Sequence, residues 1–231
     1  AHELRTPVAV IKNHGDIMLR YSDMEDDERA EFLQTIVAEC GRLAAMIQDL
    51  LFVETVEAGQ VILSDEDVDL AALCEHFTAL FRVQAEAKGM ELRCEIAADL
   101  PRLRGDSVKL GQVVANLFGN AVKFSPPNSS VLCRIDAEGP AGGEFVVLRV
   151  EDEGPGVLPE HREFIFQKYA QIRDGSTEAC EGMGLGLAIV REIVELHGGR
   201  VWVEARQPRG ARFVVMLPSA PVGTRGEVAR A

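Results

Sequence analysis

Apolar residues recur at heptad spacing through residues 28–56 of this 231-residue chain. That spacing predicts a long helix ending near Gly59, and residues 3–21 predict a shorter helix before it. An acidic connection at residues 22–27 makes the two a helical hairpin. A hairpin buries little apolar surface alone, so we expect a second copy to complete a dimeric four-helix bundle, with packing on the same chain as the alternative. The heptad a and d positions are Leu33, Ile36, Cys40, Leu43, Ile47 and Leu50.

The pattern changes after residue 60 to short strands alternating with helices. The strands at 130–137 and 144–151 flank a Gly-rich segment, which predicts an antiparallel hairpin, and the last two strands predict another. The expected fold class is therefore α+β, with the helical hairpin followed by an α/β sandwich. The predicted strands are 61–63, 91–97, 130–137, 144–151, 200–205 and 211–217, and the predicted helices are 70–87, 107–123 and 185–196.

The composition is acidic, with 37 acidic against 24 basic side chains and a formal net charge of -13. Such a field repels polyanions, so we expect no nucleic-acid partner and no direct membrane contact. Five scattered cysteines favour reduced thiols over a disulfide framework. No apolar run reaches the roughly 20 residues that span a bilayer. Because the helical pattern already holds at the first residues, we expect a cytoplasmic fragment of a longer protein, with any membrane anchor outside this sequence.

Three alternating glycines stand just before the predicted helix at 185–196, at Gly182, Gly184 and Gly186. Backbone N–H groups and the helix dipole can hold phosphate at such a position. Gly-rich turns before helices are equally typical of purely steric needs, so both readings stay open.

Asp152 follows a predicted strand and precedes Gly154 and Gly156. A carboxylate there can accept a hydrogen bond from an amino group, while the glycines let a flat ring approach the backbone. An ordinary turn is the alternative explanation.

Asn116 and Asn120 lie four residues apart on one face of a predicted helix, with Lys123 one turn further. Amide oxygens suit Mg²⁺, which keeps substrate phosphates as its other ligands. Lys123 would supply positive charge that the acidic chain otherwise lacks. Capping and core hydrogen bonding are the simpler explanations for the two asparagines.

His2 and Glu3 are adjacent at the start of the chain. A phosphoryl acceptor presents a neutral ring nitrogen, and a neighbouring carboxylate can take or orient the proton on the other nitrogen. A solvated histidine is the alternative, and composition alone does not decide between them.

Taken together, five segments resemble the sequence boxes of sensor histidine kinases, in the order that family has them. The resemblance covers residues 1–218 and implies a dimerisation and phosphoacceptor hairpin at 1–58 and an ATP-binding domain at 64–218. The Pro, Gly and charged residues of 219–231 predict a disordered tail. The segments are the phosphoacceptor box at 2–7, the N box at 112–124, the glycine boxes at 152–156 and 182–187, and the phenylalanine box at 165–169.

The resemblance also implies a role for individual residues. His2 would accept the γ-phosphoryl group of ATP, Glu3 would act as its base, and Thr6 matches the position linked to hydrolysis of the partner's phosphoaspartate. Asn120 would bind Mg²⁺, and a lid at 153–181 would close over the nucleotide. The remaining residues implied to bind ATP are Asn116, Lys123, Phe124, Asp152 (at the adenine amino group), Gly154, Gly156, Lys168, Tyr169, Gly182, Gly184, Leu185, Gly186 and Leu187.

The family further implies a homodimer that passes its phosphoryl group to the receiver domain of a response regulator. The sequence departs from the family at Gln171, where many members carry an arginine near the γ-phosphate. Either Lys168 or Arg173 substitutes, or phosphate stabilisation is weaker. Two other functions compete: an ATPase of the type found in type II topoisomerases, mismatch-repair proteins and heat-shock chaperones, and a signalling scaffold without catalysis.

Overall fold

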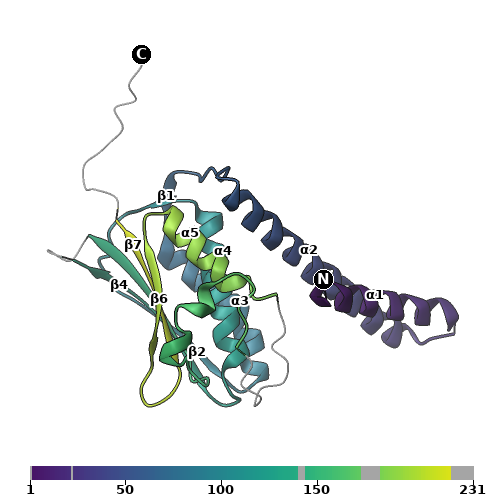
Figure 1. Cartoon of the computed structure of the whole chain (residues 1–231). Helices are drawn as coiled ribbons and strands as arrows, with labels where there is room; N and C mark the ends of the chain where they lie inside the picture. Colours follow the sequence, from purple (N-terminus) through teal and green to yellow (C-terminus); the bar gives the residue numbers. More distant parts are fainter. Residues whose placement is uncertain (1, 22, 140–143, 173–182, 220–231) are drawn as a thin grey trace. The chain divides into compact units, whose positions relative to one another are not determined.

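The structure, a computed structural model, describes residues 2–21, 23–139, 144–172 and 183–219 (Figure 1). Two compact units are distinguished: one holds the helical hairpin up to Val61 together with residues 183–186, and the other is the α/β unit, from Ile62 to Ile172 and from Leu187 onward. The predicted α+β fold class is therefore confirmed. The tail predicted at 219–231 lies outside the described residues apart from Ser219.

The predicted hairpin is formed by α1 (His2–Arg20) and α2 (Asp26–Glu57), which pack against each other. In the single chain the heptad residues Leu33 and Ile47 are 47% and 46% exposed. Part of the apolar seam is thus accessible, as expected of a surface that a second copy would cover. The dimeric four-helix bundle stays a prediction.

A five-stranded sheet forms one layer of the α/β unit, in the order β2-β4-β5-β7-β6 (Figure 1). Its strands are β2 (Glu91–Ile96), β4 (Ser130–Glu138), β5 (Phe145–Glu151), β6 (Arg200–Ala205) and β7 (Ala211–Pro218). Both predicted hairpins are confirmed, because β4 pairs antiparallel with β5, and β6 with β7. The parallel pairing of β2 with β4 was not predicted. It follows from the helix that lies between these strands in the chain, which returns the backbone to the same end of the sheet.

Three helices cover one face of the sheet and form the second layer (Figure 1). They are α3 (Leu70–Ala87), α4 (Ser107–Phe124) and α5 (Gly186–Leu196). Asp69 and Asp106 cap the first two helices, because their carboxylates accept backbone N–H bonds at 2.9 and 3.0 Å. Each cap contributes about 1 kcal/mol to helix stability. None of the helices in the described part of the chain is long and apolar enough to cross a membrane.

The strand predicted at 61–63 is wrong, since those residues are irregular. The strand that forms is β1 (Glu66–Val68), and it pairs antiparallel with β3 (Leu103–Gly105). The Arg104 guanidinium on β3 also lies 2.9 Å from the carboxylate of Asp65, the residue just before β1. The pairing partner lies almost forty residues away in the chain, and the local apolar run does not reveal it.

Candidate functional site

Asp152 follows directly after β5, and its side chain is held by backbone groups. Its Oδ1 accepts N–H bonds from Gly154 at 2.8 Å and from Ala211 at 3.3 Å. The residue is only 4% exposed. Burial raises the pKa of the Asp152 carboxyl, while the two backbone bonds and the charge of Arg206 act in the opposite direction. No donor to Oδ2 is found among the described residues, so one carboxylate oxygen is fixed and the other can accept a bond from a ligand.

The glycines of this turn are required by close backbone packing. A Cβ on Gly154 would lie 3.0 Å from the Phe124 carbonyl oxygen, at the end of α4. A Cβ on Gly156, whose φ is +78°, would lie 2.9 Å from the Gly210 carbonyl oxygen. The turn is therefore fixed between α4 and the β6–β7 connection. This supports the steric explanation for the glycines, and the ligand-binding role rests on the Asp152 carboxylate.

The last turns of α4 carry the predicted asparagines and lysine. Asn116 and Asn120 are both half-buried, one turn apart on this helix. The buried Nδ2 of Asn116 has no hydrogen-bond partner within the described residues. An unpaired buried amide is rare in folded proteins, and a bound ligand or water explains it. Lys123 is exposed, with its ammonium 5.1 Å from the centre of the partly exposed Phe124 ring.

The phenylalanine box contains the short 3₁₀ helix η3 (Phe164–Phe166), which follows η2 (Pro159–His161). The buried Phe166 ring packs edge-on against Phe213 of β7 at 6.4 Å. Lys168 lies 3.9 Å from a carboxylate on α5. Its charge is thus shared with an acidic partner, which weakens the case for it as the sole substitute for the missing arginine.

The structure describes the first part of the predicted lid, up to residue 172, but not residues 173–181. Tyr169 adopts φ +65°, which is uncommon outside glycine and marks a sharp bend just after the box. Arg173 and the rest of the lid from 173 to 181 lie outside the described residues.

The second glycine box is placed only in part. Gly182 lies outside the described residues. Gly184 has φ +68°, Leu185 is buried, Gly186 is the first residue of α5, and Leu187 is half-buried. The predicted Gly-rich turn before a helix is therefore present from Gly184 onward.

The phosphoacceptor box belongs to the hairpin, which is a separate unit from the Asp152 turn. His2 is the first residue of α1, and Glu3 and Thr6 follow in its first turns. Thr6 is exposed and Glu3 is half-buried.

The turn between β6 and β7 was not predicted as part of the site, and it supports Asp152 from the other side. Arg209 Nε donates to the Gly154 carbonyl at 3.2 Å, and a Cβ on Gly210 would lie 1.8 Å from the Asp152 carbonyl oxygen. The sequence Pro208-Arg209-Gly210 is typical of a turn, so the turn itself could have been predicted from the sequence. Its position beside Asp152 depends on the pairing of β7 with β5.

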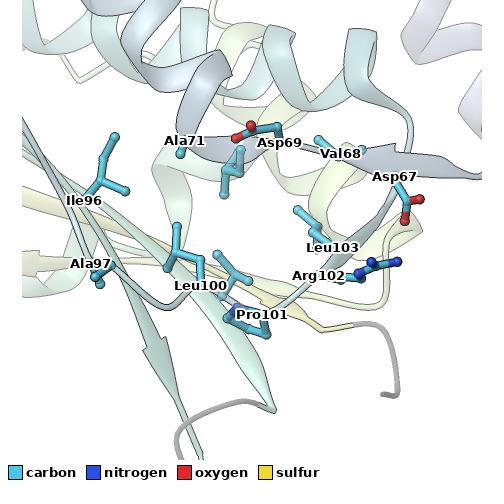
Figure 2. Close-up of a pocket in the computed structure, with 13 residues that line it drawn as sticks. Asp67, Val68, Asp69, Ala71, Ile96, Ala97, Leu100, Pro101, Arg102 and Leu103 are labelled. Atoms are coloured by element: carbon cyan, nitrogen blue, oxygen red, sulfur yellow. The ribbon is translucent and has the colours of Figure 1, made fainter. Parts of the chain in front are cut away.

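A separate pocket of about 540 Å³ lies at the other end of the sheet (Figure 2). Its walls come from β1, the start of α3, the connection at 97–102 and Val146 near the start of β5. Asp152 follows the last residue of that same strand. None of the predicted site residues lines this pocket, so it is not the predicted site.

Two family models match the chain. The "His Kinase A (phospho-acceptor) domain" matches residues 1–59, and the "Histidine kinase-, DNA gyrase B-, and HSP90-like ATPase" matches residues 105–221. The first model covers the helical hairpin, and the second covers most of the α/β unit.

Comparison with individual proteins and solved structures supports the same family. The "Alginate biosynthesis sensor protein KinB" of Pseudomonas aeruginosa is 32% identical over 94% of this chain and 36% of the relative. The chain thus spans about a third of that protein. The structure of full-length ShkA in complex with AMPPNP matches with a TM-score of 0.72 and 30% identity, covering 95% of this chain and 44% of the other. The mycobacterial sensor histidine kinase MprB matches with a TM-score of 0.57 and 32% identity, covering 68% and 99%. The chain therefore belongs to the sensor histidine kinases and carries their phosphoacceptor and ATP-binding core.

Proposed function

We propose that this chain moves the γ-phosphoryl group of ATP onto His2 and then onto an aspartate of a response-regulator receiver domain. The ATP-binding part of this proposal rests on two features that occur together in the α/β unit. These are a buried carboxylate fixed at one oxygen, Asp152, and an unpaired buried amide, Asn116, on the helix whose end packs against the Asp152 turn. The AMPPNP bound to the related ShkA supports a nucleoside triphosphate as the ligand.

Asp152 recognises the base. Its Oδ1 is occupied by two backbone N–H groups, so Oδ2 accepts the exocyclic amino group of adenine. Only the ionised carboxylate offers both oxygens as acceptors. A protonated Asp152 would present an O–H group to that amino group instead and would bind it poorly.

The phosphates lie toward α4. Asn120 would hold Mg²⁺ through its amide oxygen, and Asn116, Lys123 and Lys168 would lie beside the phosphates. When bound, Mg²⁺ neutralises part of the phosphate charge. The half-buried amides of α4 fit such a hard cation, and the unpaired Asn116 Nδ2 fits a phosphate oxygen.

The glycines and apolar residues complete the nucleotide site. Backbone N–H groups of the Gly-rich segment before α5 would donate to the phosphate oxygens at the helix N-terminus. The residues in this group are Phe124, Gly154, Gly156, Tyr169, Gly182, Gly184, Leu185, Gly186 and Leu187.

At the hairpin, a neutral ring nitrogen of His2 attacks the γ-phosphorus, the bond to the bridging oxygen breaks and ADP leaves. Glu3 takes the proton from the other ring nitrogen. Phosphohistidine then donates its phosphoryl group to the receiver aspartate. Thr6, which is exposed on α1, supports hydrolysis of the resulting phosphoaspartate. The homodimeric hairpin at 1–58 would supply the phosphoacceptor, and the domain at 64–218 would bind ATP.

Calorimetric titration with Mg-ATP tests whether the proposed site binds ATP. Asp152→Asn and Asn116→Ala are each expected to weaken binding by at least about tenfold, the loss of one charged or buried hydrogen bond. Asp136→Asn is the control, since Asp136 pairs with Arg149 on β5 and not with the turn. Equal binding by all three variants and the unaltered protein would remove this site from the proposal.

A further inference from the structure

Three consecutive acidic residues, Glu151, Asp152 and Glu153, lead from the end of β5 into the turn. Glu151 and Asp152 are both buried. Adjacent ionised carboxylates in a buried place repel one another. The proposed ligand is itself an anion, so this site needs compensating positive charge.

Arg206, at the end of β6, reaches all three residues. Its Nε lies 3.4 Å from Glu151 Oε2, and its Nη1 lies 3.1 Å from Glu153 Oε1. The same Nη1 donates to the Asp152 carbonyl at 3.4 Å. Its side chain is only 19% exposed, so the charge is weakly screened.

The other charged groups around the turn make different contacts. Arg212 pairs with Glu151 at 2.9 Å and with Glu204 at 3.5 Å. Arg209 binds only the Gly154 carbonyl among the described contacts. On the α4 side, the last turn carries the exposed Lys123.

We propose that Arg206 is a positioning residue for the nucleotide site: its charge and its bond to the Asp152 carbonyl hold the turn and keep the Asp152 carboxylate ready to accept the base. This inference rests on the proposed nucleotide-binding function and adds a residue outside the family's sequence boxes. Glu153 is already fixed by Ser130 Oγ, which donates to it at 2.7 Å. Arg206 therefore closes a link between β4, the turn and β6.

The direct test follows the Asp152 carboxyl by carbon-13 NMR in nucleotide-free protein as pH is varied. R206M is expected to raise its titration midpoint above that of the unaltered protein, because the favourable charge of Arg206 is lost while Glu151 and Glu153 remain. R206K keeps the charge and is expected to restore most of the midpoint. The matched control is R149M: Arg149 is also 19% exposed and also binds two carboxylates, Asp136 and Glu138, but away from the turn.

Nucleotide binding gives the second readout. R206M is expected to weaken ADP binding about tenfold near neutral pH, with a loss that grows as pH falls, while R149M binds as the unaltered protein does. The double variant R206M/E153Q removes one of the carboxylates that Arg206 compensates. Its Asp152 titration midpoint is expected to lie between those of R206M and the unaltered protein. If R206M alone does not fold, the double variant is titrated in its place.

Equal Asp152 midpoints in R206M and R149M would overturn the inference. Failure of the unaltered protein to bind ADP would instead overturn the proposed function, and the titration would still decide the role of Arg206.

Discussion

Asp152 and Ala211 exchange two hydrogen bonds. The Asp152 N–H donates to the Ala211 carbonyl at 2.9 Å, and the Ala211 N–H donates to Asp152 Oδ1 at 3.3 Å. The residue proposed to read the base is thus fixed, in backbone and side chain, to the first residue of β7. The geometry of the site depends on the sheet rather than on a free loop.

Gly210→Ala is expected to destabilise the α/β unit by roughly 3 kcal/mol or more and to abolish nucleotide binding. The new Cβ would meet the Asp152 carbonyl at 1.8 Å, and φ at this position is +115°. Chemical denaturation and ADP titration measure the two effects. Gly41→Ala is the control, since no atom lies within 4 Å of its added Cβ in the middle of α2. A variant at 210 as stable as the one at 41 would contradict this packing.

Asp152→Asn is expected to stabilise the nucleotide-free protein at pH 7 while weakening ATP binding. The pKa of Asp152 is raised by burial, so its ionised form is less favourable in the folded state than in the unfolded state. The stability linked to its protonation is fully present below the ordinary aspartate pKa and is lost as pH rises through the raised value. Asparagine avoids that loss and still accepts both backbone bonds.

The measurement is urea denaturation of both proteins between pH 3 and pH 8. The stability advantage of the asparagine variant is expected to appear only as pH rises. An advantage that is the same at all pH values, or a less stable variant at pH 7, contradicts the account.

His197→Ala is expected to destabilise the protein by about 1 to 2 kcal/mol. The His197 ring joins two helices: its Nδ1–H donates to the Ile193 carbonyl at 2.7 Å, and its Nε2 accepts the Asp106 N–H at 3.0 Å. Thermal melting gives the comparison, with His76→Ala as control because His76 is exposed on α3. Equal melting temperatures for the two variants would show that the ring bonds contribute nothing.

Thiol reactivity is expected to follow burial. The Cys133 thiol, together with burial, raises the pKa of the Cys94 thiol, and the Cys74 thiol and burial do the same for Cys133. Cys40 is exposed on α2 in the single chain, at a seam position that a second copy would cover. Timed alkylation of the folded protein, diluted until it is monomeric and followed by mass spectrometry, should label Cys40 before Cys133. Labelling of Cys133 as fast as Cys40 under these conditions would mean that the core opens readily.

The long periodic elements could be predicted from the sequence because their signals are local. The helix α3 begins and ends at the predicted residues 70 and 87, with Asp69 as its cap. The short strand β1 was misplaced because it is defined by Arg104 and β3, far along the chain. Local apolar runs do not encode such pairings.

The proposed site residues likewise divide into those with a local sequence signal and those whose role depends on the folded structure. Asp152 and the asparagines of α4 could be proposed as site residues from the sequence, because their types and spacing are local and match the family. Arg206 was not found, because its role depends on β5, β6 and the turn meeting in three dimensions. The unpaired amide of Asn116 likewise becomes visible only when its surroundings are known.

The most direct test of the central claim is to incubate the protein with γ-labelled Mg-ATP and examine the phosphate that it retains. The account predicts label that is acid-labile and alkali-stable, absent in His2→Gln and strongly reduced in Asn120→Ala, with Asn13→Ala, an exposed asparagine of α1, as control. Label that persists in His2→Gln, or no label in a protein shown to bind ATP, would contradict it.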